Sequence, residues 1–361
     1  MADLSVTGYG PEPVTDPARP RILVVGPSWV GDMVMAQTLF ADLQARQPCH
    51  IDVLAPAWCR PLLSRMPEVR QALDLPFGHG ELKLRQRRAE GRALRGRYDH
   101  AYVLPNSLKS ALLPFWAGVP RRTGWRGEMR YGLLNDVRRL DKERYPLMVQ
   151  RFVALARPAD APVPVLEEIR PPHLEVDPAS VAAAREQHEL AADRPVLGLC
   201  PGAEFGPSKR WPEQHYAAVA ADWIEQGGRV WLFGSAKDRP VADAIVAALP
   251  AAGRDRVRVL AGATSLEQAV DLLSATDAVV SNDSGLMHIA AALNRPLVAV
   301  YGSTSPGFTP PLGQRVAVER LGLDCSPCFQ RECPLEHHNC MRLLEPARVV
   351  TALRGLSVGG N

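Results

Sequence analysis

A repeated alternation of apolar strands and amphipathic helices limits the fold of this 361-residue chain more than any other feature. The segment 21–25 (RILVV) is apolar after its first residue. It leads through a glycine-containing turn into a pattern whose apolar residues recur at helical spacing over 34–43. Further strands are expected at 50–55 and 101–105, each before a helix-like segment. Because continuous apolar strands alternate with helices, we expect a parallel sheet covered on both faces.

The same pattern starts again after the proline-rich stretch 157–172 (RPADAPVPVLEEIRPP). One helix boundary is well specified, because Pro212 stands at a first helical position and the pair Gly227 and Gly228 supplies the end. The restart predicts a second α/β domain. Its expected strands lie at 195–202, 229–235, 256–262, 277–283 and 297–303.

We therefore predict an α/β protein of two Rossmann-like domains. Parallel sheets place their ligand-binding loops at the carboxyl ends of the strands, so the two domains are expected to line a cleft suited to a two-substrate enzyme. The predicted division is a disordered extension at 1–18, a first domain at 19–165, a second domain at 166–344, and a carboxyl-terminal helix at 345–361 that packs back on the first domain.

The two halves of the chain differ in charge. Residues 19–157 hold 24 Lys and Arg against 12 Asp and Glu, whereas residues 158–361 hold 18 against 24. Arginine suits bidentate contacts with phosphate or carboxylate, although runs of charge are also found as plain solvated surface. The basic clusters are Arg85, Arg87, Arg88, Arg92, Arg95 and Arg97, and then Arg121, Arg122, Arg126 and Arg130.

The sequence also predicts a cytoplasmic protein. No stretch approaches the roughly 20 apolar residues that span a bilayer, and the first residues lack the basic start and apolar run of a signal peptide. Four cysteines follow the spacing C-x2-C-x4-C-x6-C, which is compatible with a structural zinc or iron–sulfur site or with free thiols. Disulfides are disfavoured in a reducing compartment, and we expect no catalytic role for Cys325, Cys328, Cys333 and Cys340.

The loop 26–33 (GPSWVGDM) follows the first strand and carries a candidate base. It is not a Walker loop, because Asp32 stands where that motif requires Lys, and the chain has no G-x-G-x-x-G fingerprint. An acidic side chain beside a helix start repels phosphate. Asp32 is therefore better placed as a base, with capping of the following helix as the alternative.

A second loop, 200–212 (CPGAEFGPSKRWP), lies between a strand and a helix in the second half. Backbone N–H groups at a helix start, together with Lys209, would neutralise a diphosphate leaving group. The alternative is that Lys209 and Arg210 are solvated surface residues. A weaker signal is Asp238, a carboxylate that follows a strand and is placed to contact a ribose.

A third loop, 281–288 (SNDSGLMH), indicates sugar and phosphate recognition. Asp283 can bind hydroxyl groups, while Ser284 and Gly285 offer backbone donors at another helix start. His288 follows in the first turn of that helix, and we expect it to orient neighbouring groups rather than transfer protons.

Five segments resemble the ADP-heptose:lipopolysaccharide heptosyltransferases of glycosyltransferase family 9. They are GPSWVGDMVMAQTL, APAWCRPLLSRMPEV, AYVLPNSLKSALLPFWAGVPRRTGWRGEMRYGLLNDVR, LCPGAEFGPSKRWP and VSNDSGLMHIAAALNRPLVAVYGSTSPGFTPPL. The resemblance implies a GT-B fold. It also implies an inverting transfer of L-glycero-D-manno-heptose from ADP-heptose to heptose I of the lipid-A-linked lipopolysaccharide core, without a cofactor or a catalytic metal.

Site residues follow from the same resemblance. It implies that Asp32 is the general base, that Lys209 contacts the diphosphate and that Asp238 lies near the adenosine ribose. Asp283, Ser284 and Gly285 match the donor-binding loop, with His288 beside them. The first domain is implied to hold the acidic acceptor, and its arginines, Arg122 and Arg126 among them, would steer that substrate at the cytoplasmic face of the inner membrane.

Three other readings remain open from the sequence. One is a different GT-B enzyme, either a sugar-nucleotide epimerase or a transferase with another donor. A second is a nucleic-acid-binding module on the basic half, which is disfavoured because its arginines are not interleaved with stacking aromatics and the second domain would be unexplained. The third is a catalytically silent scaffold at the membrane.

Overall fold

The computed structural model describes residues 16, 18–77, 81–191 and 193–358. The predicted extension at 1–18 therefore lies almost entirely outside the described residues. The chain divides into two compact units, Met1–Pro171 and Pro172–Asn361, each described here by itself. The division falls at the end of the proline-rich stretch, a few residues after the predicted 165/166 boundary.

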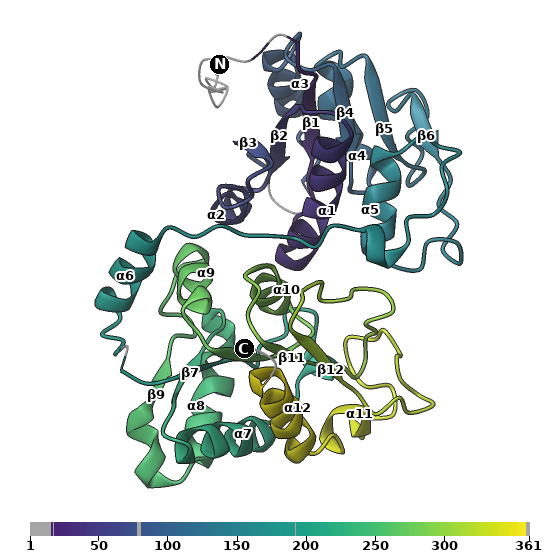
Figure 1. Cartoon of the computed structure of the whole chain (residues 1–361). Coiled ribbons are helices and arrows are strands. Elements are labelled where there is room, and N and C mark those ends of the chain that lie inside the picture. The colour runs from purple at the N-terminus through teal and green to yellow at the C-terminus, as the bar shows by residue number, and fades with distance from the viewer. Residues whose placement is uncertain (1–15, 17, 78–80, 192, 359–361) are drawn as a thin grey trace. The chain divides into compact units, whose positions relative to one another are not determined.

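Unit 1 is a six-stranded parallel sheet with the order β3-β2-β1-β4-β5-β6, covered by helices (Figure 1). Its strands are β1 (Arg21–Val25), β2 (His50–Ala55), β3 (Val69–Asp74), β4 (His100–Val103), β5 (Arg121–Trp125) and β6 (Asp136–Arg138). Its α-helices are α1 (Val30–Arg46), α2 (Arg60–Leu63), α3 (Leu84–Ala93), α4 (Leu108–Trp116) and α5 (Met148–Ala156).

Unit 2 is a second six-stranded parallel sheet, ordered β12-β11-β10-β7-β8-β9. Its strands are β7 (Val196–Cys200), β8 (Arg229–Leu232), β9 (Val257–Val259), β10 (Ala278–Asn282), β11 (Leu297–Val300) and β12 (Val316–Glu319). Its α-helices are α6 (Pro178–Gln187), α7 (Glu213–Glu225), α8 (Arg239–Ala248), α9 (Leu266–Ser274), α10 (Gly285–Ala292), α11 (Asn339–Arg342) and α12 (Pro346–Val358).

Both sheets have the strand order of a Rossmann fold, which confirms the predicted fold class. The order reverses between β1 and β4 in unit 1 and between β7 and β10 in unit 2. Ligands of such sheets bind outside the carboxyl ends of the strands at this switch point. The loops after these four strands are therefore where a site is expected in each unit.

The carboxyl-terminal helix α12 belongs to unit 2. Its Val349 and Leu353 are buried in the same core cluster as Tyr216 and Val300, and its Arg354 forms an ion pair of 2.6 Å with Asp222 of α7. Its apolar side thus covers the second sheet, and the predicted contact of this helix with the first domain stays a prediction. Within the described residues, no helix has the length and apolar character needed to cross a membrane.

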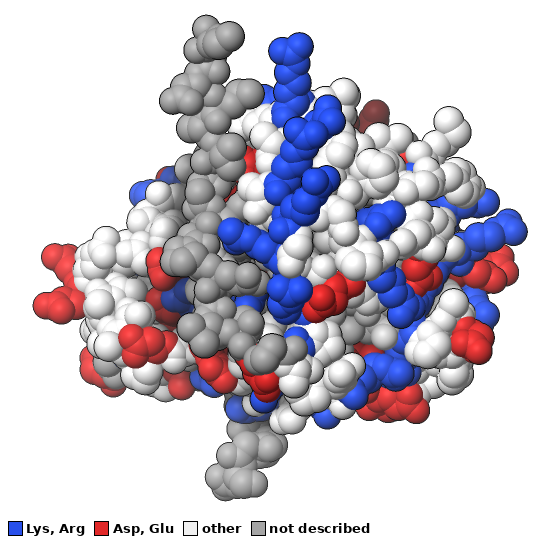
Figure 2. All heavy atoms as spheres, turned by 90° about the horizontal axis from the view of Figure 1, so that it is seen from above, with Lys and Arg blue, Asp and Glu red and all other residues white. Residues whose placement is uncertain are grey.

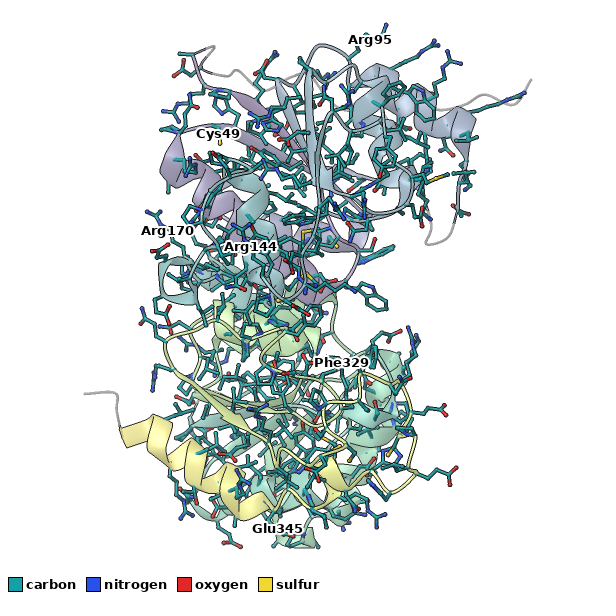
Figure 3. All side chains as sticks on the ribbon, turned by 90° about the vertical axis from the view of Figure 1, so that its right-hand side faces the viewer. Cys49, Arg95, Arg144, Arg170, Phe329 and Glu345 are labelled. Atoms are coloured by element: carbon teal, nitrogen blue, oxygen red, sulfur yellow. The ribbon has the colours of Figure 1, made fainter. Side chains whose placement is uncertain are left out.

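Helix α3 in unit 1 has one buried face and one exposed, basic face. The buried face includes Arg87, Gly91 and Leu94, and a Cβ at Gly91 would lie 2.8 Å from the Cβ of Trp116 on α4. This close approach fixes the opposite face outward. Figure 2 looks onto the end of unit 1 where α3 lies in Figure 1 and shows a column of basic side chains, and Arg95 projects from the ribbon in Figure 3.

Candidate active site

Asp32 lies at the switch point of unit 1, in the first turn of α1 directly after β1. The N-cap residue of α1 is Trp29, so Asp32 does not occupy the capping position that was the alternative role. Its side chain is partly exposed. Asp32 therefore lies at the edge of the sheet where ligands of such folds bind.

Two tryptophans that sequence reasoning missed flank the same loop. Trp29 and Trp58 are 49 % and 51 % exposed, and the Trp58 indole N–H donates a 3.1 Å hydrogen bond to the carbonyl of Ser28. They follow β1 and β2, which are neighbours in the sheet. The available signal was a tryptophan soon after each of two adjacent strands, at the edge where ligands bind.

The two acceptor candidates Arg122 and Arg126 lie toward opposite ends of β5. The Arg122 guanidinium is committed to main-chain carbonyls of Val119 and Leu133, with the Nε bond at 2.6 Å. Arg126 follows the carboxyl end of the strand and is exposed. Of the two guanidinium groups, only that of Arg126 is thus left exposed to a ligand.

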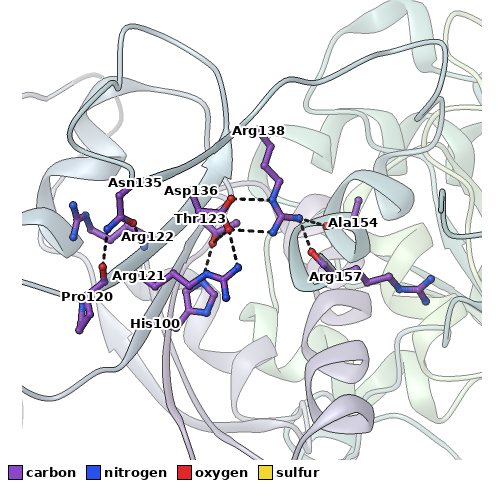
Figure 4. A network of polar contacts seen from close by, with 10 residues as sticks. All are labelled: His100, Pro120, Arg121, Arg122, Thr123, Asn135, Asp136, Arg138, Ala154 and Arg157. Carbon is purple, nitrogen blue, oxygen red and sulfur yellow. Dashed lines mark hydrogen bonds and ion pairs between the residues drawn. The ribbon is translucent and has the colours of Figure 1, made fainter. Parts of the chain in front are cut away.

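A second charge cluster in unit 1 is structural rather than a ligand site (Figure 4). His100 bonds to the hydroxyl of Thr123 at 2.7 Å, and that hydroxyl donates to Asp136 at 2.8 Å. Burial lowers the pKa of His100 to about 4. Burial alone would raise the pKa of Asp136, but hydrogen bonds from Arg138 and Thr123 outweigh it and lower the pKa to about 2. The carboxylate of Asp136 is thus held by ion pairs with Arg121 and Arg138 inside unit 1.

The cavity beside this cluster, of about 280 Å³, is lined by several arginines. Two of them, Arg138 and Arg157, are bonded within unit 1. Arg138 donates to the carbonyls of Ala154 and Arg157, and Arg157 forms a 2.9 Å ion pair with Asp42. This basic lining therefore holds the end of α5 in place.

In unit 2 the predicted donor residues converge at the switch point. The Lys209 ammonium lies 2.6 Å from a carboxylate oxygen of Asp283, and the Thr304 hydroxyl donates to the same oxygen at 2.6 Å. Both charged side chains are largely buried, with 14 % and 5 % of their surfaces exposed. Loops after β7, β10 and β11 thus meet on one carboxylate. Thr304 was not predicted as a site residue, because no motif in the loop after β11 pointed to a ligand.

Asn282, the last residue of β10, anchors the loop after β7. Its side-chain amide donates to the carbonyl of Pro201 at 2.6 Å, and its carbonyl oxygen accepts from the Trp211 N–H and the Tyr216 hydroxyl. The residue is fully buried. Buried amides with all partners satisfied favour one arrangement of the chain, so this side chain fixes the loop 200–212.

The predicted residues around α10 are where the sequence placed them. Ser284 is the N-cap residue and Gly285 begins the helix, so the first N–H groups of α10 point toward the site, as helix geometry requires. His288 is 5 % exposed, and burial lowers its pKa to about 4, against an opposing effect of Asp283. His288 is therefore uncharged at neutral pH, which fits an orienting role.

Asp238 lies in the loop after β8, at the carboxyl ends of the strands of unit 2. Its carboxylate accepts from the Ser235 N–H and hydroxyl at 2.9 and 2.8 Å. A Cβ at Gly202 or Gly234 would fall 2.5 or 2.8 Å from Asp238 atoms. Both glycines are thus required for the carboxylate to reach the loops after β7 and β8.

The cysteine-rich segment, residues 325–340, is in the same unit. The thiols of Cys325, Cys328 and Cys333 contribute to raising the pKa of Cys340, after burial, so the four groups are neighbours. In the part of the chain that the structure describes, no group of three or more His, Cys, Asp or Glu side chains is arranged to hold a metal ion. The metal site therefore stays a prediction from spacing alone.

Comparison with known proteins agrees with this geometry. The family model of glycosyltransferase family 9 (heptosyltransferase) matches residues 87–339. The chain is 54 % identical to lipopolysaccharide heptosyltransferase 2 of Escherichia coli K12 over 93 % of this chain and 98 % of that protein. It is 49 % identical to lipooligosaccharide heptosyltransferase 2 of Haemophilus ducreyi, over 93 % and 99 %.

Solved structures give the same answer. The structure of E. coli ADP-heptose lipopolysaccharide heptosyltransferase II superimposes with a TM-score of 0.82 at 51 % identity, covering 94 % of this chain and 98 % of that one. The two Rossmann-type units and this structural match show a glycosyltransferase fold of the GT-B type. The chain belongs to glycosyltransferase family 9 and is a heptosyltransferase.

Proposed function

We propose that this enzyme transfers L-glycero-D-manno-heptose from ADP-heptose to heptose I of the lipopolysaccharide inner core, with inversion. The observation that carries the proposal is the Lys209–Asp283–Thr304 cluster at the switch point of unit 2. The choice of sugar and acceptor is supported by the near full-length relatives, which are named lipopolysaccharide heptosyltransferase 2.

In the proposed reaction Asp32 acts as the general base. It takes the proton of the acceptor hydroxyl while the oxygen attacks the anomeric carbon in line with the departing diphosphate. One carboxylate is sufficient for inversion, because only one displacement occurs. Its exposure at the ligand edge of the first sheet supports this role. A positioned base typically contributes ~10²–10⁴-fold to the rate.

Unit 2 supplies the other half of the proposed chemistry. Lys209 and the N–H groups at the start of α10, beside Ser284 and Gly285, stabilise negative charge as it develops on the diphosphate. Asp238 contacts the ribose. Neutral His288, which is buried within the electrostatic reach of Asp283, orients groups of the site without transferring protons. Each donor to a developing charge contributes on the order of 3 kcal/mol.

The acceptor half of the proposal rests on unit 1. The acceptor carries carboxylates on its ketosugar acids and phosphates on its lipid, and exposed Arg126 at the carboxyl end of β5 suits such groups. Trp29 and Trp58 offer ring faces beside Asp32 on which a sugar can stack. Arg122 is left out, because its guanidinium is committed to the main chain.

A coupled assay of ADP release tests this function. The purified chain receives ADP-heptose and a heptose-I-terminated core, and release that requires both substrates supports the proposal. Release with another sugar nucleotide but not with ADP-heptose indicates a transferase with a different donor. Conversion of the sugar nucleotide without any acceptor indicates an epimerase.

We further propose that the enzyme contacts the inner membrane through the outer face of α3. That face and the turn after the helix carry four exposed arginines that form no ion pair with any described residue, Arg85, Arg88, Arg92 and Arg95. Leu82 and Leu84 precede them and are 48 % and 49 % exposed. Arg87 holds this segment by donating to the carbonyls of Glu81 and Leu82. Basic side chains near an anionic bilayer contribute about 1 kcal/mol each.

Vesicle co-sedimentation tests the membrane contact. Arg88→Glu with Arg92→Glu is expected to abolish binding to vesicles rich in phosphatidylglycerol, whereas turnover of a detergent-dispersed acceptor is kept. The matched control reverses Arg258 and Arg342, which are equally exposed on unit 2. Binding that ignores anionic lipid, or equal losses in both pairs, removes α3 as the docking face. Displacement by DNA rather than by lipid would indicate a nucleic-acid partner instead.

A further inference from the structure

The cysteine-rich segment is bonded to the proposed donor site through its main chain. The Ser208 hydroxyl donates to the carbonyl of Gln330 at 2.6 Å, and the Ser208 N–H donates to the carbonyl of Arg331 at 3.2 Å. On the other side the Phe329 N–H donates to the carbonyl of Ser303 at 2.8 Å. The segment therefore bridges the loop after β7 and the loop after β11. Figure 3 labels Phe329 on it.

Gly206 in the loop 200–212 makes this approach possible. A Cβ at Gly206 would lie 2.4 Å from the carbonyl oxygen of Arg331, closer than any side chain tolerates. Ser208, two residues later, is 1 % exposed and also bonds to the hydroxyl of Ser303 at 3.0 Å. The position of Arg331 relative to this loop is thus fixed by packing and not by its own side chain.

The Arg331 side chain extends from this anchor over the ring of Phe205. Its guanidinium carbon lies 5.4 Å from the ring centroid, and the Lys209 ammonium lies 5.0 Å from the same centroid. Two cations therefore share one aromatic ring, an arrangement that holds each by cation–π attraction. The ring places Arg331 next to the lysine that we assign to the diphosphate.

The charge balance distinguishes the two cations. Lys209 is already compensated by Asp283 at 2.6 Å, so the pair adds little net positive charge for a diphosphate that carries at least two negative ones. Arg331 is exposed and forms no ion pair with any acid among the described residues. Its planar guanidinium can make two parallel hydrogen bonds to phosphate oxygens.

We propose that Arg331, presented by the cysteine-rich segment, binds the diphosphate of the nucleotide sugar together with Lys209. This inference rests on the proposed donor site and extends it to a residue that precedes α11. It also gives the cysteine-rich segment a function, which is to hold this arginine at the loop 200–212.

Calorimetric titration of the full chain with ADP, AMP and adenosine tests the assignment. Arg331→Gln is expected to weaken ADP binding roughly 10-fold or more and to leave adenosine binding unchanged. Arg331→Lys keeps the positive charge but not the planar guanidinium with its two parallel donors. It is expected to recover part of the lost ADP affinity. Arg342→Gln is the matched control, because Arg342 is an exposed arginine of the same unit without an ion pair to a described residue.

Each result of these titrations either supports or overturns the role of Arg331. Equal ADP affinity in wild type and Arg331→Gln overturns the role of Arg331 but leaves the donor site intact. Equal losses for ADP and adenosine indicate a structural effect and also overturn it. A wild-type chain that binds no ADP contradicts the proposed donor itself, and the assignment of Arg331 with it. Thermal melting of the variants verifies that each is folded, as expected when only an exposed side chain changes.

Discussion

The two units share a strand order but build their ligand edges differently. In unit 2 the loops at the switch point are joined by buried polar side chains, since Asn282 and Asp283 are 0 % and 4 % exposed and bond to several loops. In unit 1 the buried Arg130 donates to the carbonyls of Pro105 and Trp125, while Trp29 after β1 and Arg126 after β5 are exposed.

This difference fits two kinds of ligand. A small nucleotide sugar is bound best by a site whose polar groups are already oriented, because little ordering then remains to oppose binding. A lipid-linked oligosaccharide presents spaced charges and sugar faces, for which exposed arginines and aromatic rings are suited. The comparison leads to three predictions, given from the largest expected effect to the smallest.

The largest effect is expected on kcat when the proposed base in unit 1 is removed, with donor binding in unit 2 left unchanged. Asp32→Asn is expected to lower kcat by ~10²–10⁴-fold, because the acceptor hydroxyl loses its base. ADP affinity should stay unchanged, since the donor residues lie in unit 2. Initial rates and calorimetry measure the two. Asp42→Asn on the same helix is the control and should affect stability only, because Asp42 pairs with Arg157. Wild-type kcat in Asp32→Asn would refute the base.

The second effect tests whether the site of unit 2 is held by its own ion pair. Lys209→Met leaves the buried Asp283 carboxylate without its cation, which is expected to lower the free energy of unfolding by on the order of 3 kcal/mol. Adding Asp283→Asn should restore much of that stability but not ADP binding. Urea unfolding and ADP titration follow the two quantities. Equal stability of all three chains would show that the pair contributes nothing to the fold.

The third effect compares the buried histidines of the two units. His288 and His100 both have pKa values lowered to about 4 by burial, against about 6.5 when unfolded. The unfolded chain therefore binds more protons in this range, so stability is complete above pH 6.5 and falls as the pH drops toward 4. The loss at His288 amounts to at most about 3 kcal/mol. Melting temperatures from pH 7 to 4.5 should show it, and His288→Asn should flatten the curve. A melting temperature independent of pH would contradict both values.

Much of the fold was predictable because local pattern carries it. Apolar runs predicted β1 and β2 within their observed bounds, and Ser265 caps α9 with the Gln268 side chain bonding back to it. The strands that escaped prediction are short or polar, such as β6 (DVR) and β5 (RRTGW). They become strands only because a neighbouring edge offers hydrogen bonds, which no local pattern records.

The sequence by itself determined the two α/β units, the loops at their strand ends and the residue types of the donor site, since spacing along one strand–turn–helix sets these. Only the tertiary structure decided that α12 covers the second sheet and that Lys209 is paired with Asp283. It also decided that Arg122 donates to main-chain carbonyls and that Arg331 reaches the ring of Phe205. Apart from those of Arg122, these contacts join segments far apart in the chain. Their free energy depends on burial and on competing partners, which the linear order of residues does not contain.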